Sequence, residues 1–199
     1  MNQTQTFIDS EGNAWFERNQ RRLGERDPVS ERMRARGIMP KRILEIGCAN
    51  GWRLKRLKEE YGCDVAGIDP SKQAVQLADM KEVQRGWASR LCFLDGDFDT
   101  VIYGFCLYVT DPDEWFAIVA EGDRVLANGG RIVIHDFGDY ASPHAVKYAH
   151  ADGVLAYHVN FAALWLMHPW YRLIDWHPTG DSELVAIIEK DSKRLPVWP

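Results

Sequence analysis

The feature that most constrains this chain is a hydrophobic run that passes through a turn of small residues into an amphipathic stretch. Residues Arg42–Ile46 are mostly apolar, and Trp52–Tyr61 repeats large apolar side chains at helical spacing. Between them, Gly47-Cys48-Ala49-Asn50-Gly51 carries small side chains that let the backbone bend sharply and approach a ligand. We therefore predict a strand, a tight turn and a helix whose unpaired N-terminal N–H groups face that ligand.

The same alternation continues through most of the chain. Short β-branched runs and helical stretches follow each other, with Gly, Pro and Asp at their boundaries. We predict further strands at residues 64–68, 82–87, 98–104, 131–136, 171–176 and 183–189, and helices at 72–80, 111–128 and 154–167. This order is typical of an α/β domain with helices on both faces of a mostly parallel sheet. No internal repeat or linker divides the 199 residues, which predicts a single domain.

A carboxylate at the tip of the second predicted strand is the next candidate site residue. Asp69 follows the run Val65–Ile68 and lies 22 residues after Gly47. A carboxylate in this position can accept hydrogen bonds from the two hydroxyls of a ribose, although a helix-capping aspartate is placed in the same way. A nicotinamide fingerprint fails, because the G-x-G-x-x-G spacing from Gly47 puts Ala49 and Trp52 where glycine is needed.

The segment ILEIGCANG resembles the first motif of class I S-adenosylmethionine-dependent methyltransferases. An acidic residue stands two positions before the first glycine, and another glycine follows four positions after it. The resemblance implies that Glu45 orients the turn and the amino group of the cofactor. The residues implied to line its methionine moiety are Gly47, Cys48, Ala49 and Gly51. Ala49 departs from the family pattern, which usually has glycine there, and a purely structural tight turn is the alternative.

Two later segments are similar to further motifs of the same family. Asp69 resembles its ribose ligand, and Pro70 resembles the neighbour of that ligand beside the adenine. Residues 98–107 resemble the family's F-D-x-V strand and the residues that follow it. The residues of this segment that are implied to face the cofactor are Tyr103, Gly104 and Phe105.

The adenine position is less well matched. Residues 86–91 are similar to a family stretch that often reads G-x-A-D-x-L, in which the acidic residue meets the adenine amino group. Ser89 stands in place of that acid, so this contact differs from the family's. The adenine candidates that remain are the backbone of Ala88 together with Trp87 or Ser89.

The resemblance also implies an architecture and a cofactor. The fold is then a Rossmann-like, doubly wound sheet of about seven strands, mostly parallel with the last strand antiparallel, preceded by a helical cap. The single domain 1–199 would divide into an N-terminal cap or lid at 1–40, a cofactor-binding half at 41–136 and an acceptor-side half at 137–199. The implied cofactor is S-adenosyl-L-methionine, and the implied product is S-adenosyl-L-homocysteine.

The N-terminal stretch carries a resemblance of its own. Residues 15–19 are similar to the W-x-x-R-N leader of methyltransferases found with bacterial surface-sugar biosynthesis. Because that leader closes over the cofactor, the candidate lid residues are Trp15, Arg18 and Asn19. An ordinary amphipathic cap is the alternative.

The catalytic candidates come from the second half of the chain, where all six histidines lie between residues 135 and 177. Methyl transfer needs a base only when the acceptor carries a proton that must leave. His135 and Asp136 end the fifth predicted strand, where ligands of open α/β sheets bind. His150 follows later in the chain, two residues after Tyr148. These three residues are our candidates, with a satisfied polar pair at a strand end as the alternative. The histidine spacing matches no zinc site, so no metal is expected.

Charge and composition limit the partners of the chain. Its 24 basic and 29 acidic residues give a net charge of −5, which argues against a nucleic-acid surface. Residues 17–42 nevertheless hold nine basic and four acidic residues, and form either a solvated helix surface or a rim that attracts an anionic acceptor. Without a long apolar run or a secretory signal, we expect a cytoplasmic protein without membrane insertion, as a monomer or homodimer.

The expected reaction is methylation of a small molecule, with a hydroxyl or amine of a sugar or nucleotide-linked sugar as the preferred acceptor. Two alternatives stay open, because cofactor motifs report binding and not the fate of the methyl group. The protein could instead cyclise or cleave its cofactor, or be a noncatalytic cofactor-binding module. Incubation with the cofactor alone, followed by a search for methylthioadenosine, would distinguish cyclisation or cleavage of the cofactor from methyl transfer.

Overall fold

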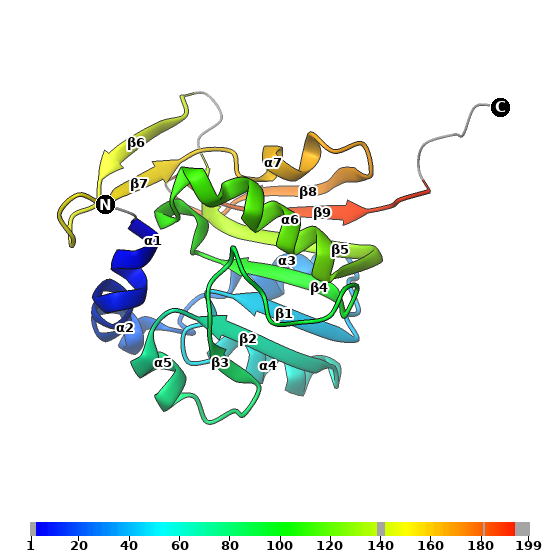
Figure 1. Ribbon diagram of the computed structural model, residues 1–199. Helices are drawn as coiled ribbons and strands as arrows, with labels where there is room; N and C mark the ends of the chain where they lie inside the picture. The colour runs from blue at the N-terminus through cyan, green and yellow to red at the C-terminus, as the bar shows by residue number, and fades with distance from the viewer. Residues whose placement is uncertain (1–2, 139–141, 181, 194–199) are drawn as a thin grey trace.

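The centre of the protein is a sheet of seven strands, seen in a computed structural model that describes residues 3–138, 142–180 and 182–193. Six strands run parallel, and the last one is antiparallel to both of its neighbours (Figure 1). The spatial order is β3 (Val83–Arg85), β2 (Asp64–Asp69), β1 (Arg42–Ile46), β4 (Phe98–Gly104), β5 (Leu126–Phe137), β9 (Glu183–Lys190) and β8 (Tyr171–Pro178). The expected Rossmann-like sheet and the reversal of its last strand are confirmed.

The sheet is covered on both faces. In β1, Ile43 packs in one hydrophobic cluster with Leu54 of α4 (Trp52–Tyr61), whereas its neighbour Leu44 packs in another with Ile118 of α6 (Trp115–Val125). Helix α3 (Pro28–Ala35) joins the first cluster and the short helix α7 (Ala162–Leu166) joins the second. Successive side chains of a strand point to opposite faces, and strands buried on both faces read as continuous apolar runs. This is why the central strands could be predicted.

The predicted helix at 154–167 is wrong. The structure has a strand there, β7 (Leu155–His158), followed by the short helix α7. β7 pairs with β6 (His144–Lys147) in a separate antiparallel sheet of two strands. Asn160 then accepts a hydrogen bond from the backbone N–H of Ala163 at 3.2 Å, at the start of α7. Two elements of four and five residues are too short for their apolar periodicity to tell strand from helix.

Smaller differences concern element boundaries. Helix α5 (Lys72–Leu77) ends at Leu77 rather than Met80. Helix α6 ends at Val125, and β5 begins at once with Leu126. The segment Asn128-Gly129-Gly130, where the predicted helix 111–128 ends, instead lies within β5, at an irregularity in its pairing with β4.

The expected N-terminal helical cap is present as a series of short helices. They are α1 (Gln3–Thr6), a π-helical turn (Phe7–Glu11), α2 (Gly12–Asn19) and a 3-10 turn (Gln20–Arg22). Figure 1 shows α1 and α2 beside the ends towards which the parallel strands point, close to β6 and β7. The Gln3 side chain fastens this segment, because its Nε2 donates to the carbonyl oxygens of Val109 at 2.9 Å and Leu155 at 3.2 Å.

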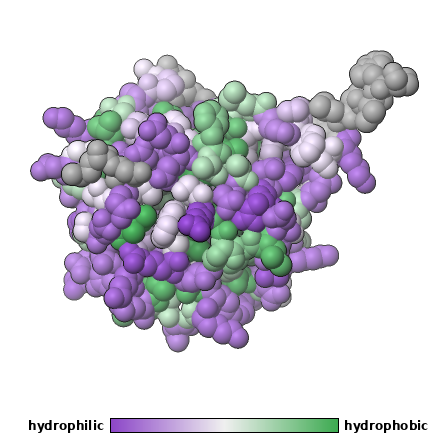
Figure 2. Space-filling model, viewed as in Figure 1, coloured by the Kyte–Doolittle hydropathy of each residue, from purple (hydrophilic) through white to green (hydrophobic). Residues whose placement is uncertain are grey.

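The surface carries scattered apolar side chains. Figure 2 shows a mostly hydrophilic face on which apolar residues form separate patches. Among the described residues, the most exposed large apolar side chains are those of Leu94, Met167 and Phe116, at 78%, 77% and 76%. Within the described residues, no helix combines the length and the apolar character that crossing a bilayer requires.

Candidate functional site

Two pockets lie at the carboxyl ends of the parallel strands. Pocket A, with an empty volume of about 780 Å³, is bounded by the ends of β1, β2 and β4 and by the N-terminal helices. Pocket B, of about 660 Å³, lies between the turn after β1, the end of β5 and the segment that leads to α3. Four residues line both pockets: Trp15, Gly47, Gly104 and Phe105. The pockets therefore meet at these residues, which we call the neck.

The turn after β1 has the conformation that its small residues predict. Gly47 and Gly51 both adopt φ of 75°, in the left-handed region that favours glycine. A Cβ on Gly47 would lie 2.7 Å from the Cβ of Cys106, so this position has no room for a side chain. Ala49, which departs from the family pattern, also has a positive φ of 51°. This backbone conformation costs a residue with a side chain about 1 kcal/mol relative to glycine, so Ala49 is strained.

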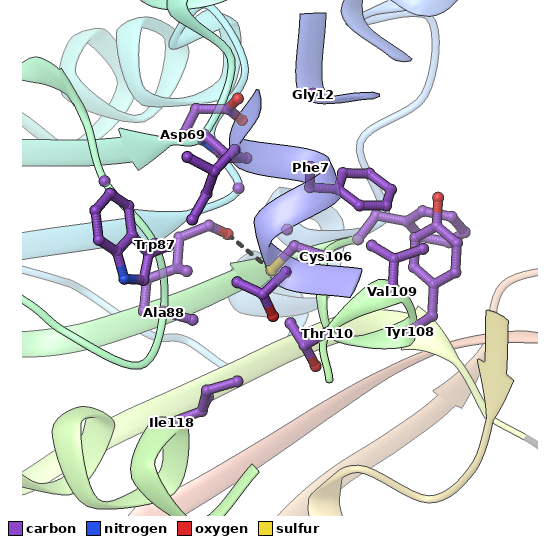
Figure 3. Close-up of a pocket in the computed structure, with 18 of the residues that line it drawn as sticks. Phe7, Gly12, Asp69, Trp87, Ala88, Cys106, Tyr108, Val109, Thr110 and Ile118 are labelled. Atoms are coloured by element: carbon purple, nitrogen blue, oxygen red, sulfur yellow. Dashed lines mark hydrogen bonds between the residues drawn. The ribbon is translucent and has the colours of Figure 1, made fainter. Parts of the chain in front are cut away.

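Asp69 connects this turn to the tip of β2. Its Oδ2 accepts the backbone N–H of Ala49 at 2.8 Å, and its Oδ1 accepts that of Ser71 at 2.8 Å. Burial raises the pKa of Asp69 to about 6, although the two N–H groups act in the opposite direction. The carboxylate lines pocket A (Figure 3) and keeps further lone pairs for a ligand.

Glu45 lies behind the turn and lines neither pocket. It is 1% exposed, and its Oε1 pairs with the guanidinium of Arg53, which also donates from Nε to Asp27 at 2.9 Å. Burial raises the pKa of Glu45, and the charge of Arg53 opposes this shift. A Cβ on Gly104 would lie 2.7 Å from Glu45 Oε1, so the carboxylate sits directly against the neck. Its other oxygen, Oε2, is buried and has no hydrogen-bond partner among the described residues.

The adenine candidates form one side of pocket A. Trp87 and Ala88 line it, and Figure 3 shows them opposite Tyr108. Ser89 does not line the pocket; its Oγ donates to Glu114 Oε2 at 2.8 Å. Glu114, which does line the pocket, brings a carboxylate to this side from the start of α6.

The opposite wall is the turn after β4. Phe105 has φ of 59°, and its N–H donates to the carbonyl oxygen of His135 at 2.8 Å. Asp136, fully buried at the end of β5, accepts the N–H of Leu107 at 2.7 Å and that of Phe137 at 2.8 Å. Burial raises the pKa of Asp136 to about 7. Asp136 lines neither pocket, and its oxygens instead hold the backbone of this wall.

His135 lies in pocket B. Both of its ring nitrogens lack a hydrogen-bond partner among the described residues, and Nε2 lies 3.6 Å from Glu183 Oε2. The histidine lowers the pKa of Glu183. The Phe105 ring lies 5.2 Å from the imidazole, centroid to centroid, so His135 sits next to the neck. Arg22 and Arg26 line the same pocket.

Four further predicted site residues line neither pocket. Tyr103 is buried beneath α6, with its ring centroid 5.1 Å from that of Trp165. Cys48 is buried in the cluster on the α4 face of the sheet. His150 is exposed and contacts Tyr148 edge to face, at 5.4 Å between centroids. Gly51 faces β3 instead, because a Cβ at this position would lie 2.7 Å from Val83 Cγ2.

Of the candidate lid residues, only Trp15 reaches the pockets. Asn19 donates from Nδ2 to the carbonyl oxygen of Trp15 at 2.8 Å. Arg18 pairs with Glu11, and the hydroxyl of Tyr148 donates to the same Glu11 carboxylate at 3.0 Å. Arg18 and Asn19 therefore hold the N-terminal segment in place without lining a pocket.

Several residues that line pocket A were not predicted as site residues. They come from the N-terminal helices, from the turn after β4, from the 3-10 turn before α6 and from α6 itself, and are Thr4, Phe7, Ile8, Tyr108, Val109, Glu114 and Ile118. Only Glu114 belonged to a recognisable pattern, the Asp-Pro-Asp-Glu start of a helix, and that pattern explains capping rather than binding.

Known proteins resemble this chain in sequence. Residues 43–130 match the model of a family described as a methyltransferase domain. A geranyl diphosphate 2-C-methyltransferase from Saccharopolyspora erythraea is 33% identical over 109 residues, which cover 49% of this chain and 37% of the relative. A 27-O-demethylrifamycin SV methyltransferase from Amycolatopsis mediterranei is 28% identical over 128 residues, with coverage of 57% and 46%. The matches thus span less than half the length of these curated relatives.

Solved structures resemble most of this chain in fold. A 1,6-didemethyltoxoflavin-N1-methyltransferase from Burkholderia thailandensis, crystallised with 1,6-didemethyltoxoflavin and S-adenosylhomocysteine, superposes with a TM-score of 0.75 over 96% of this chain and 91% of that one, at 19% identity. An S-adenosylmethionine-dependent methyltransferase from Mesorhizobium loti gives a TM-score of 0.61 over 81% of this chain and 98% of that one, at 17% identity. At these identities the likeness shows a common fold.

Proposed function

We propose that this chain is a class I S-adenosylmethionine-dependent methyltransferase that transfers a methyl group from that cofactor to a small-molecule acceptor, and the match of residues 43–130 to a methyltransferase domain supports this. One observation carries the proposal: two pockets meet at a neck, with the Asp69 carboxylate in one and an imidazole in the other. Pocket A takes the adenosine, and pocket B takes the amino-acid tail together with the acceptor. The reacting atoms then lie at the neck.

The described residues fit this cofactor. Asp69 can accept both ribose hydroxyls while it holds the turn after β1. The missing Cβ of Gly47 leaves space where the two pockets join. The unpaired Oε2 of Glu45, just behind the neck, is a suitable acceptor for an ammonium group.

In the proposed reaction the protein orients the reactants and moves one proton. The bound cofactor supplies a methyl group on a sulfonium. Trp15 and Phe105, which line both pockets, offer aromatic faces to that cation. His135 accepts the proton of the acceptor hydroxyl or amine at Nε2, and Glu183, 3.6 Å away, stabilises the resulting imidazolium.

For the acceptor we propose a hydroxyl or amine of a sugar or nucleotide-linked sugar that carries an anionic group. Arg22 and Arg26 line pocket B and suit an anion, and Trp15 and Trp52 suit the face of a sugar ring. The resemblance of residues 15–19 to surface-sugar methyltransferases supports the same class. The acceptors named for the two curated relatives differ from each other and therefore do not narrow the choice.

Replacing Asp69 by alanine tests where the cofactor binds. Loss of the charge-assisted contacts to the ribose is expected to weaken the binding of S-adenosylhomocysteine by roughly 1.5–3 kcal/mol, or about 10- to 150-fold in Kd. Isothermal titration calorimetry measures this directly. Asp64→Ala, at the exposed opposite end of the same strand, is the matched control and should leave Kd unchanged. Equal affinity of the wild type and Asp69→Ala would remove Asp69 from the site and refute the proposal.

Binding of S-adenosylhomocysteine is also expected to depend on pH through Asp69. Because the pKa of this carboxyl is raised to about 6, the free protein takes up a proton there as the pH falls through that value. Ribose hydroxyls donate to the ionised form, so affinity should be constant above about pH 7 and should decline below about pH 6. Titrations across this range measure the effect. A profile that is flat for the wild type, or equally steep for Asp69→Ala, would contradict the assignment.

A further inference from the structure

We propose that Arg22 and Arg26 form a phosphate-binding site in pocket B, which makes the acceptor a phosphate ester or a diphosphate. Both side chains line pocket B, and both residues are exposed. The inference rests on the proposed function, because pocket B must hold the acceptor. It narrows the anionic group of that acceptor to a phosphate.

A turn brings the two arginines to the same cavity. Gly24, which lies between them, has φ of 87°, in the left-handed region that favours glycine. The N–H of Glu25 donates to the carbonyl oxygen of Arg22 at 3.2 Å and closes the turn. A Cβ on Gly24 would lie 3.4 Å from Trp52 Cε3, so the turn packs against a side chain that also lines pocket B. The fold therefore presents both guanidinium groups to one ligand.

The positive charge of these arginines is not neutralised by neighbouring acids. Other arginines of residues 17–42 have such partners: Arg18 pairs with Glu11, Arg32 and Arg36 with Asp175, Arg34 with Glu60, and Arg42 with Asp97. Arg22 approaches Glu25 only at 3.9 Å, and both side chains are exposed, so this pair contributes little. Among the described residues Arg26 forms no ion pair, and its Nη2 donates to the backbone carbonyl oxygen of Thr179. Both groups are therefore available to an anion.

The contact with Thr179 prepares Arg26 for binding. It joins the turn to the connection between β8 and β9, across 153 residues of the chain. A carbonyl oxygen fixes the guanidinium without cancelling its charge, so part of the side-chain entropy that binding would cost is already lost on folding. Glu183 is the one carboxylate among the described residues that line pocket B, and it lies 3.6 Å from His135. The two arginines thus outweigh it.

Two guanidinium groups suit a phosphate better than a carboxylate. Each guanidinium presents a planar fork of N–H groups that matches two oxygens of an anion. A carboxylate has two oxygens and one charge, which a single guanidinium satisfies. A phosphate monoester or a diphosphate has more oxygens and up to about two or more charges, and can use both arginines. Because both residues are exposed, the anion keeps part of its hydration and loses little free energy on entering.

Calorimetric titration of pyrophosphate into protein saturated with S-adenosylhomocysteine tests this site. At constant ionic strength, pyrophosphate is expected to bind at least about tenfold more tightly than acetate. Arg26→Gln should weaken pyrophosphate binding by about fivefold or more, and Arg22→Gln by a smaller factor because its side chain is not held in advance. Inorganic phosphate is the second probe. Tighter binding of pyrophosphate indicates a diphosphate acceptor, whereas tighter binding of inorganic phosphate indicates a monoester.

The controls separate this inference from the proposed function. Arg21→Gln removes the same charge from an exposed neighbour that does not line pocket B, and should leave the Kd of pyrophosphate unchanged. Arg26→Gln should bind S-adenosylhomocysteine as the wild type does, which also shows that the variant is folded. Equal Kd values of pyrophosphate in Arg21→Gln and Arg26→Gln would overturn the phosphate site alone.

Two further outcomes are decisive. Displacement of S-adenosylhomocysteine by pyrophosphate would overturn the phosphate site, because the arginines would then hold the carboxylate of the cofactor's tail. Failure of the wild type to bind S-adenosylhomocysteine would overturn the proposed function and this inference with it.

Discussion

Replacing Arg53 by methionine is expected to lower the free energy of unfolding by about 3–5 kcal/mol. Arg53 is 5% exposed, pairs with Glu45 and donates to Asp27 at 2.9 Å. Methionine keeps much of the apolar stem but leaves two carboxylates, each no more than 3% exposed, without their shared cation. A buried charge that loses its partner costs far more than the pair contributes, and this asymmetry sets the size of the effect.

Urea unfolding near neutral pH measures this loss, and Arg56→Met provides the matched control. Arg56 lies on the same helix, 3.9 Å from Asp27 Oδ2, but its side chain is half exposed, so its loss should cost less than about 1 kcal/mol. Without Arg53 the folded-state pKa values of the two carboxyls rise above their unfolded values. The deficit of Arg53→Met should therefore shrink as the pH falls and these groups become neutral. Equal losses in the two variants would contradict the prediction.

The cofactor half could be predicted because its signals are local. Gly47 needs a left-handed φ and an empty Cβ position, and only glycine supplies both. Asp69 could be placed at the tip of a strand because the apolar run Val65–Ile68 already predicts that strand. The bounds of β1, β4 and α4 agree with the prediction for the same reason, since each is a single uninterrupted pattern.

The misplaced residues show where a motif alone is insufficient. Tyr103 shares its face of β4 with Val101, two positions earlier, and both pack in the cluster beneath α6. The period of two along a strand would have assigned Tyr103 to the core, whereas the family motif suggested the ligand side. Asp136 likewise stands at a strand end where ligands bind, but its oxygens are taken up by backbone N–H groups. Sequence gives the position of such a group and not its partners.

The remaining walls of the pockets depend on contacts between distant segments. Gln3 reaches Leu155 across 152 residues, and Ser89 reaches Glu114 across 25. Neither contact has a periodicity or spacing that one sequence can reveal. The N-terminal helices and α6 therefore contribute to pocket A in ways that only the folded chain displays.

Replacing Asp136 by alanine is expected to lower the free energy of unfolding by about 2–4 kcal/mol, because buried N–H groups lose their acceptor. The donors are those of Leu107 and Phe137, at 2.7 and 2.8 Å, with that of Tyr108 at 3.4 Å. The turn that carries the first and third of these donors is a wall of pocket A. Affinity for S-adenosylhomocysteine should therefore fall together with stability, and calorimetric titration and urea unfolding of the same variant measure both.

Asp136→Asn distinguishes this positioning role from a catalytic one. Burial raises the pKa of Asp136 to about 7, so near neutrality the group is partly protonated, and an amide resembles that form. The amide keeps one oxygen as acceptor, and the variant should lose less than about 1.5 kcal/mol and retain most of its affinity. Methyl transfer by Asp136→Asn is the measurement that separates the two roles. A positioning residue should retain most of this activity together with its affinity, whereas replacing a general base by an amide would abolish proton transfer at similar stability and binding. Wild-type stability of Asp136→Ala would show that the wall of pocket A does not depend on this carboxylate.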